Sequence, residues 1–230
     1  MEIPKSKLGF SDLKPIGTFN VCNIFSPLGA NTAENFSQLK NNVSGIKLHD
    51  DLIMSGQPFY ASFFDSTKAF AAETNQNDYT KFEKLLITSI KNALDNSKIN
   101  TRGKKTVLII SSTKGNISLL ETETCSKALQ TRISLNTSAK LVAEHFGFTN
   151  KPVVVSNACI SGLLAILTGM RLIRSGQYEN AVVAGADVIS KFVLSGFQSF
   201  QAISATLCKP FDAARDGINL GEGAGTVILT

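Results

Sequence analysis

One cysteine stands where a strand pattern gives way to a helix pattern. The segment VVVSNACISGLLAILTGMRLIRSG (153–176) begins with an apolar run, reaches Cys159, and continues with apolar residues at helical spacing. The N-terminus of a helix carries about half a positive charge and unpaired backbone N–H groups. These features lower the pKa of a thiol below the ~8.5 of a free cysteine and stabilise an adjacent oxyanion. The position therefore favours a nucleophilic thiol.

A structural role is the alternative interpretation of Cys159. Cysteine is among the most buried residue types, and a strand-to-helix junction is often part of the core. Small residues nevertheless flank this thiol (Ala158, Ser161 and Gly162), and they would let a substrate approach the sulfur. The local features alone leave both interpretations open.

The elements that must position Cys159 follow from hydrophobic periodicity. Continuous apolar runs predict strands buried on both faces, and apolar residues three or four apart predict helices. Strands are expected at 16–25, 105–112, 151–158, 180–187 and 223–230. Helices are expected at 30–40, 77–94, 118–130, 137–147 and 160–175, and the aromatic stretch 57–66 is left unassigned.

Several residues mark the ends of these helices. Asn31 is a candidate N-cap with Glu34 three residues later, the spacing of a capping box. Gly147 and Gly176 follow the last residues of two predicted helices, where glycine commonly ends a helix. Strands that alternate with such helices predict an α/β fold with a sheet covered on both faces.

Composition limits the class of protein. The chain has 230 residues, 43% hydrophobic and 18% charged, so we expect a globular fold with a sizeable core. The four cysteines (Cys22, Cys125, Cys159 and Cys208) are widely spaced, which argues against a zinc site or disulfides and for reduced thiols in the cytoplasm. The net charge of +5 comes from scattered residues, so no nucleic-acid partner is expected. No apolar run is long enough for a transmembrane helix, and the N-terminus does not resemble a secretory signal.

Domain organisation is predicted to be simple. No internal repeat, low-complexity tract or Pro-rich linker divides the chain, so residues 1–230 are interpreted as a single domain. The sequence ends inside a strand pattern, GAGTVILT, which leads us to expect a fragment that stops at an internal boundary.

Four motifs in order carry a resemblance to a known family. They are SNACISG, YENAVVAGAD, GFQSFQAIS and CKPFDAARDGINLGEGAGTVIL, and SPLGANTAENFSQLKNNVSGI upstream adds to them. Together they resemble the N-terminal half of the β-ketoacyl-acyl carrier protein synthases, condensing enzymes of the thiolase-like superfamily, over roughly residues 16–230. Ile160 after the cysteine and the string INLGEG depart from the usual family pattern and leave the subclass open.

The resemblance implies a fold and a chemistry. The fold would be the first of two similar halves, a five-stranded mixed sheet of order 3-2-1-4-5 with the last strand antiparallel and helices on both faces. Cys159 would accept an acyl chain as a thioester from acyl carrier protein. Malonyl-carrier thioester would then lose CO2, and its carbanion would attack the acyl carbonyl in a decarboxylative Claisen condensation. No cofactor or metal is implied.

The resemblance also implies roles for other residues and for partners. Phe197 matches the phenylalanine that gates the acyl pocket, whereas the charges of Asp212, Arg215, Asp216 and Glu222 would brace turns. The family's two catalytic histidines and a phenylalanine amide come from the C-terminal half, and neither His49 nor His145 matches their motifs. A homodimer through residues 152–157, or pairing with a C-terminal half or partner subunit, would follow. The helix 160–175 is apolar all round, which fits a position between two halves.

Two other classes stay open. A non-catalytic partner subunit of the chain-length-factor type would share the fold, but such subunits generally lack the cysteine. Another thiolase-fold acyltransferase would place its cysteine in a similar turn, although the string PFDAARDG with GEGAG fits it less well. Lys114 and Gly115 follow a predicted strand, where α/β folds often place functional loops, but no chemistry is assigned to them.

Overall fold

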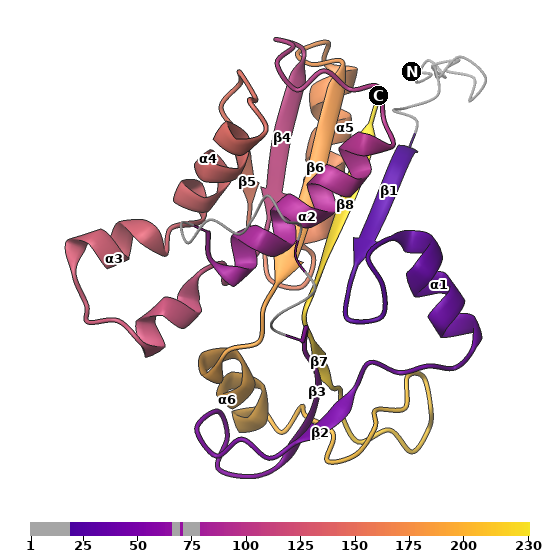
Figure 1. Ribbon diagram of the computed structural model, residues 1–230, viewed down its shortest axis with the longest axis vertical. Coiled ribbons are helices and arrows are strands. Elements are labelled where there is room, and N and C mark those ends of the chain that lie inside the picture. Colours follow the sequence, from indigo (N-terminus) through magenta and orange to yellow (C-terminus); the bar gives the residue numbers. More distant parts are fainter. Residues whose placement is uncertain (1–18, 66–69, 71–78) are drawn as a thin grey trace, which may run out of the picture.

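A computed structural model describes residues 19–65, 70 and 79–230 of the chain (Figure 1). The predicted strand 16–25 and the predicted helix 77–94 each begin with residues that lie outside the described part. The elements in chain order are β1 (Phe19–Phe25), α1 (Thr32–Lys40), β2 (Lys47–His49), β3 (Phe59–Ser62), α2 (Lys81–Asp95), β4 (Thr106–Ser111), η3 (Ile117–Glu121), α3 (Lys127–Arg132), α4 (Leu135–His145), β5 (Val153–Val155), α5 (Ser161–Arg174), β6 (Asn180–Asp187), α6 (Lys191–Ser199), β7 (Leu220–Gly221) and β8 (Gly223–Leu229).

The main sheet has five strands in the order β1-β8-β6-β4-β5. Strands β5, β4 and β6 are parallel, and β8 runs antiparallel to both β6 and β1. The mixed five-stranded α/β class and the antiparallel last strand agree with the prediction. The predicted order 3-2-1-4-5 is wrong, because in sequence order these five strands lie 3-2-4-5-1.

The difference in order concerns the first strand. β1 pairs with β8 and lies at the edge of the sheet, where it was expected at the centre. Its side chains alternate between exposed (Cys22, Ile24) and buried (Asn23, Phe25), which suits an edge position with one covered face. All six residues of β4 are buried, which suits a strand with neighbours on both sides.

Helices cover the two faces of this sheet. Alternate residues of β4 point in opposite directions, as the pleat of a strand requires. Leu108 and Ile110 belong to a large core cluster with α2 and α4, whereas Val107 and Ile109 belong to a smaller cluster with α5. In Figure 1, α2 crosses in front of the sheet and α5 lies behind it.

A smaller sheet lies beyond one end of the main sheet (Figure 1). It consists of β2, β3 and β7, with β2 antiparallel and β7 parallel to β3. Phe59 and Ala61 of β3 pack with Ile189 and with Leu194 of α6. The unassigned stretch 57–66 therefore contains a strand, and this sheet was not predicted. Because β7 and β8 are separated by a single residue, the small sheet is tied directly to the main one.

The helix ends match the predicted signals closely. The side chain of Asn31 caps α1 by accepting from the N–H of Glu34, while the Glu34 carboxylate accepts from the N–H of Ala30. Gly147 and Gly176, just past α4 and α5, have φ of +69° and +72°.

The predicted helix 118–130 is replaced by two short pieces, η3 and α3. In the described part of the chain, no helix has the length and apolar character needed to cross a membrane.

Candidate active site

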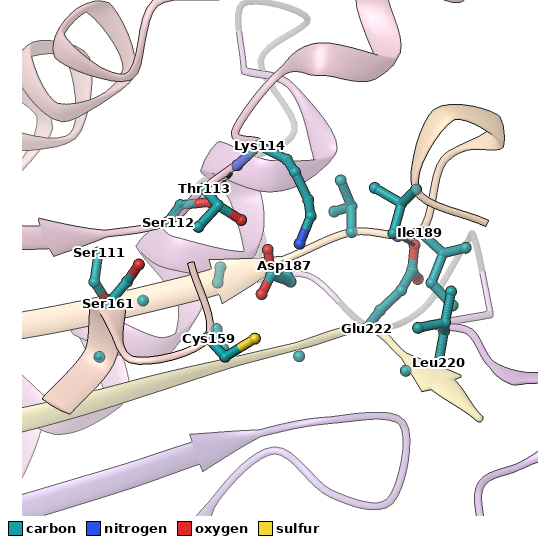
Figure 2. Close-up of a pocket in the computed structure, with 18 of the residues that line it drawn as sticks. Ser111, Ser112, Thr113, Lys114, Cys159, Ser161, Asp187, Ile189, Leu220 and Glu222 are labelled. Atoms are coloured by element: carbon teal, nitrogen blue, oxygen red, sulfur yellow. Dashed lines mark hydrogen bonds between the residues drawn. The ribbon is translucent and has the colours of Figure 1, made fainter. Parts of the chain in front are cut away.

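A cavity of about 850 Å³ opens at the ends of β4 and β6, beside the turn that precedes α5. Strand β6 lies at the centre of the main sheet, and its carboxyl end faces the same side as that of its parallel neighbour β4. Figure 2 shows the site with the labelled side chains that line it. The lining comes from residues 111–114 after β4, residues 158, 159, 161 and 162 of the turn, residues 185–189, Val193 and Phe197, and residues 220–225.

The structure places Cys159 in the turn between β5 and α5. Ala158 adopts a left-handed backbone conformation with φ of +44°, which is uncommon for a residue with a side chain. The hydroxyl of Ser161 accepts from the N–H of Asn157 at 2.8 Å and donates to the carbonyl of Ala158 at 2.8 Å. These bonds hold the turn in a sharp shape. Cys159 is exposed, so the thiol faces the cavity and is not part of the core.

The start of α5 is open to a ligand. Ile160 is the N-cap, and within the described residues no side chain caps this helix. The first N–H groups of a helix have no intrahelical partner and form an electropositive end. Gly162 lines the cavity and has open space where a Cβ would lie. An oxyanion that forms beside Cys159 would meet donors here.

Phe197 lines the same cavity as Cys159. It belongs to α6, which Ser190 caps by accepting from the N–H of Val193. Phe197 is half-buried, whereas the nearby Phe200 is 81% exposed and does not line the cavity. The two predicted site residues therefore meet in one cavity, although they are 38 positions apart (197 − 159).

Glu222 lines the cavity wall but is engaged by the backbone. Its carboxylate accepts from the N–H groups of Phe64 and Ile189, and it pairs with Lys81 at 2.6 Å. These contacts join the end of β3, the end of β6 and α2. The structural role predicted for Glu222 agrees with this geometry.

The other charges predicted to be structural also bond locally. Asp212 accepts from the N–H of Ala214 at 2.7 Å, and Arg215 donates to the carbonyl of Asp212 at 2.9 Å. Asp216 accepts from the hydroxyl of Ser204 at 2.7 Å. These bonds close turns in the segment before β7, as expected.

The two histidines lie outside the cavity lining. His49 is at the end of β2, 3.1 Å from the carbonyl of Ala61, and His145 is 3.1 Å from the hydroxyl of Tyr79. Both are satisfied by protein groups, as predicted. Among the described residues, no group of three His, Cys, Asp or Glu comes together as a metal site.

Two charged residues of the site, Lys114 and Asp187, were given no role from the sequence: Lys114 was noted in a loop after a predicted strand without an assigned chemistry, and Asp187 was missed. Asp187 is the last residue of β6, and Lys114 lies in the loop after β4. Burial raises the pKa of Asp187, and the positive charge of Lys114 opposes that rise. Asp187 is exposed at the cavity surface, although the surrounding protein desolvates its carboxyl group in part. The sequence signal that could have identified them is their position: Asp187 ends one predicted parallel strand and Lys114 closely follows another, and functional residues often lie at the carboxyl ends of such strands.

Comparison of the sequence with models of known protein families identifies the family of the chain. Residues 23–230 match the family described as β-ketoacyl synthase, N-terminal domain. The chain belongs to this β-ketoacyl synthase family. The match covers the turn with Cys159, the cavity and all but the first four described residues (19–22).

Curated relatives of this β-ketoacyl synthase domain are polyketide synthases or similar large synthases. It is 37% identical over 92 residues to 3-methylorcinaldehyde synthase of Sarocladium schorii, an alignment with 38% of this chain and 3% of that protein. It is 36% identical over 101 residues to the phenolphthiocerol synthesis polyketide synthase type I Pks15/1 of Mycobacterium bovis, with 43% of this chain and 5% of that protein aligned. The chain thus matches only a small part of the length of these relatives.

Solved structures show the same fold. A chain in the structure of the ketosynthase ApeO with its chain length factor ApeC, from Xenorhabdus doucetiae, matches with a TM-score of 0.75 and 23% identity. The match covers 93% of the present chain and 57% of that chain. The thiolase-like ketosynthase fold of this β-ketoacyl synthase domain is therefore shown, as the resemblance implied.

Proposed function

We propose that Cys159 is the acyl acceptor of a β-ketoacyl-acyl carrier protein synthase, in fatty-acid or polyketide-type synthesis. The observation that carries the proposal is the exposed thiol at the uncapped start of α5, facing a cavity that Phe197 also lines. Residues 1–230 would act as one N-terminal domain. Its four thiols are free, which suits a reducing compartment such as the cytoplasm.

The loading step follows from this geometry. The Cys159 thiolate attacks the carbonyl carbon of an acyl thioester on acyl carrier protein, and a new C–S bond forms. The first N–H groups of α5 stabilise the negative oxygen of the tetrahedral intermediate. The intermediate then collapses, the bond to the carrier sulfur breaks, and the carrier thiolate takes up the proton that Cys159 released. Phe197, which lines the same cavity, would gate the entry of the acyl chain, as the resemblance implies.

Condensation would need groups beyond those in this sequence. In the enzymes that the chain resembles, two histidines and a phenylalanine amide act on the second substrate. His49 and His145 do not line the Cys159 cavity, and each contacts a protein partner. We therefore propose that this chain accepts an acyl group but does not carry out the condensation without a C-terminal half or partner subunit.

A non-catalytic role as a chain-length-factor type subunit is the second candidate. One of the solved structures with the same fold contains such a factor, ApeC, beside its ketosynthase. The exposed Cys159 in the cavity favours the acyl acceptor, since that subunit type generally lacks the cysteine. A different thiolase-fold acyltransferase would use the same thiol with other thioesters.

We also propose a two-fold dimer through residues 152–157. β5 lies at the edge of the main sheet, and its three valines are half-buried and carry no charge. An uncharged edge strand readily pairs with a second chain. Sedimentation should show a dimer at micromolar concentration that Val154→Lys converts to monomer. A wild-type monomer under these conditions would refute this interface.

Transfer of an acyl group from acyl carrier protein tests the proposed function. Intact mass measurement should show one acyl adduct on the wild-type chain and none on Cys159→Ala. Cys125→Ala is the matched control, because Cys125 is exposed as well but lies outside the cavity. Equal acylation of the Cys159→Ala chain would contradict the assignment.

A further inference from the structure

The loop that carries Lys114 has a fixed conformation. The hydroxyl of Ser112 accepts from the N–H of Gly115 at 3.2 Å and from the N–H of Lys114 at 3.4 Å. Gly115 has φ of +51°, and a Cβ at this position would lie 2.5 Å from Cδ2 of Leu135. The positive φ therefore favours glycine next to Lys114, and the two hydrogen bonds to Ser112 hold the backbone of this loop.

A buried polar network anchors the same loop from the other side. The amide of Asn116, which is 1% exposed, donates to Glu83 at 3.0 Å and to Ser138 at 3.0 Å. Glu83 is fully buried and pairs with Arg132. Hydrogen bonds thus fix the backbone on both sides of Lys114, so the position of its Cα is well defined.

Lys114 brings the positive charge into the cavity. Among the described residues that line the cavity it is the only lysine, arginine or histidine. Figure 2 shows its side chain extending toward the carboxylate of Asp187, with the Cys159 thiol facing the same space. The other acidic residue of the lining, Glu222, already pairs with Lys81. An incoming anion would therefore meet Lys114 and Asp187 first.

The ammonium of Lys114 could turn from the carboxylate of Asp187 to the carboxylate of a ligand. The carboxylate of Asp187 attracts the ammonium of Lys114, but desolvation by the surrounding protein favours the neutral form of this carboxyl group. A ligand carboxylate that enters the cavity offers the ammonium a second anion. Such an ion pair is stronger beside the protein wall of the cavity than it is in bulk water.

We propose that Lys114 is a specificity-determining residue that binds the carboxylate of an anionic acyl thioester, of the malonyl type, beside Cys159. Asp187 is the positioning residue for its ammonium. This inference rests on the proposed function, because it assumes that thioesters enter this cavity. The inference goes beyond the proposed function by naming a residue of this chain that would distinguish an acyl thioester with a free carboxylate from a neutral acyl thioester.

Two alkylating reagents of different charge test the inference on the chain itself. Iodoacetate is an anion and iodoacetamide is neutral, and both alkylate a thiolate with loss of iodide. The ratio of their rates at Cys159, divided by the same ratio at the exposed Cys125, reports the local field. Any change in the pKa of the thiol affects both reagents and cancels in the ratio. We expect this normalised ratio to exceed one by about three- to tenfold in the wild-type chain.

Variants assign the effect to Lys114. Lys114→Met should bring the normalised ratio to within about twofold of one, Lys114→Arg should preserve it, and Asp187→Asn should raise it by about twofold. Lys140→Met, which removes an equal charge from a side chain 74% exposed outside the cavity, should leave it unchanged. The Arg variant guards against loss of folding as the cause.

Binding of a thioester gives the second readout. Malonyl-N-acetylcysteamine should slow the reaction of Cys159 with iodoacetamide more strongly than acetyl-N-acetylcysteamine does, and Lys114→Met should remove the difference. A wild-type ratio near one, or a ratio that Lys114→Met leaves intact, would overturn the inference. Failure of acyl transfer from acyl carrier protein would instead refute the proposed function, because the reagent ratio does not depend on that transfer.

Discussion

Helices α2 and α5 cover opposite faces of one sheet, yet they are built differently. α2 buries large aliphatic side chains, and Leu85, Leu86, Ile87 and Ile90 have no exposed surface. α5 buries only Ser161, Ala165 and Gly169, all of them small, and Leu163 on its outer side is 59% exposed. Both helices are rich in apolar residues, so composition does not explain the difference.

The small residues of α5 explain how it contacts the sheet. A Cβ on Gly169 would lie 3.0 Å from Leu229 and 3.2 Å from Ala181, so the absence of a side chain lets the helix approach closely. The larger side chains Ile166, Met170 and Ile173 pack against the sheet but are only partly buried. A helix that is apolar on all sides needs cover on all sides, whereas α2 has cover already. We infer that the sheet face covered by α2 forms a complete core within this chain. The outer side of α5, the helix that begins next to Cys159, would be covered by a second half or subunit.

A matched pair of substitutions separates the two faces most strongly. Leu86→Ala in α2 removes a fully buried side chain and should lower the free energy of unfolding by about 3 kcal/mol. Leu163→Ala in α5 removes a largely exposed side chain and should change it by less than about 1 kcal/mol. Urea unfolding followed by circular dichroism measures both. Equal losses would show that α5 is covered in this chain.

The next largest effect concerns the polar end of α2. Burial raises the pKa of Glu83, but hydrogen bonds from Arg132, Thr80, Ser138 and Asn116 outweigh it and leave the pKa below the ordinary 4.5. A lowered folded-state pKa contributes stability above the unfolded value, and this stability is lost as pH falls through the folded value.

Glu83→Gln should therefore lower the free energy of unfolding by about 2 kcal/mol near neutral pH, a reduced figure because Arg132 keeps some contact with solvent. The loss should shrink as pH falls below the ordinary 4.5 and through the lower folded-state pKa, below which the wild-type carboxylate is protonated as well. Glu144→Gln is the matched control, since its 3.7 Å pair with Lys140 is exposed. A pH-independent difference between wild type and Glu83→Gln would contradict the charge-based account.

The smallest effect on stability, but a clear one on association, is expected at the outer side of α5. Leu163→Ser should reduce binding of a dye specific for exposed apolar surface and should improve solubility, because the uncovered face becomes more polar. Leu39→Ser in α1 is a matched control, since Leu39 is 62% exposed on another helix. An equal reduction in dye binding by both substitutions would mean that α5 carries no special apolar surface.

The sequence predicts the elements better than their arrangement. The run NAVVAGAD coincides with β6 at both ends, because buried strands are continuous apolar segments. The partner of β1 could not be predicted in this way. Phe19 pairs with Leu229, and no local pattern reports a contact between residues so far apart in the sequence.

In the candidate site, too, local features were predictable from the sequence and contacts between distant segments were not. The turn at Cys159 was predictable, because a motif places a thiol between a strand and a helix in consecutive residues. The pair of Lys114 and Asp187 was not, because their proximity depends on β4 and β6 being neighbours in the sheet. The third core cluster, with Phe59 and Leu194, likewise requires a small sheet whose strands are only two to four residues long.

Amide hydrogen exchange tests the contrast between the two helices most directly. The amides of α2 should exchange only through global unfolding, whereas those of α5 should exchange through a smaller opening that the uncovered face permits, at least about tenfold faster. Peptides that span 81–95 and 161–174 can be compared in one mass-spectrometric experiment on the wild-type chain. Equal protection of the two helices in the wild-type chain without a C-terminal half or partner subunit would contradict the account, because it would mean that α5 needs no further cover.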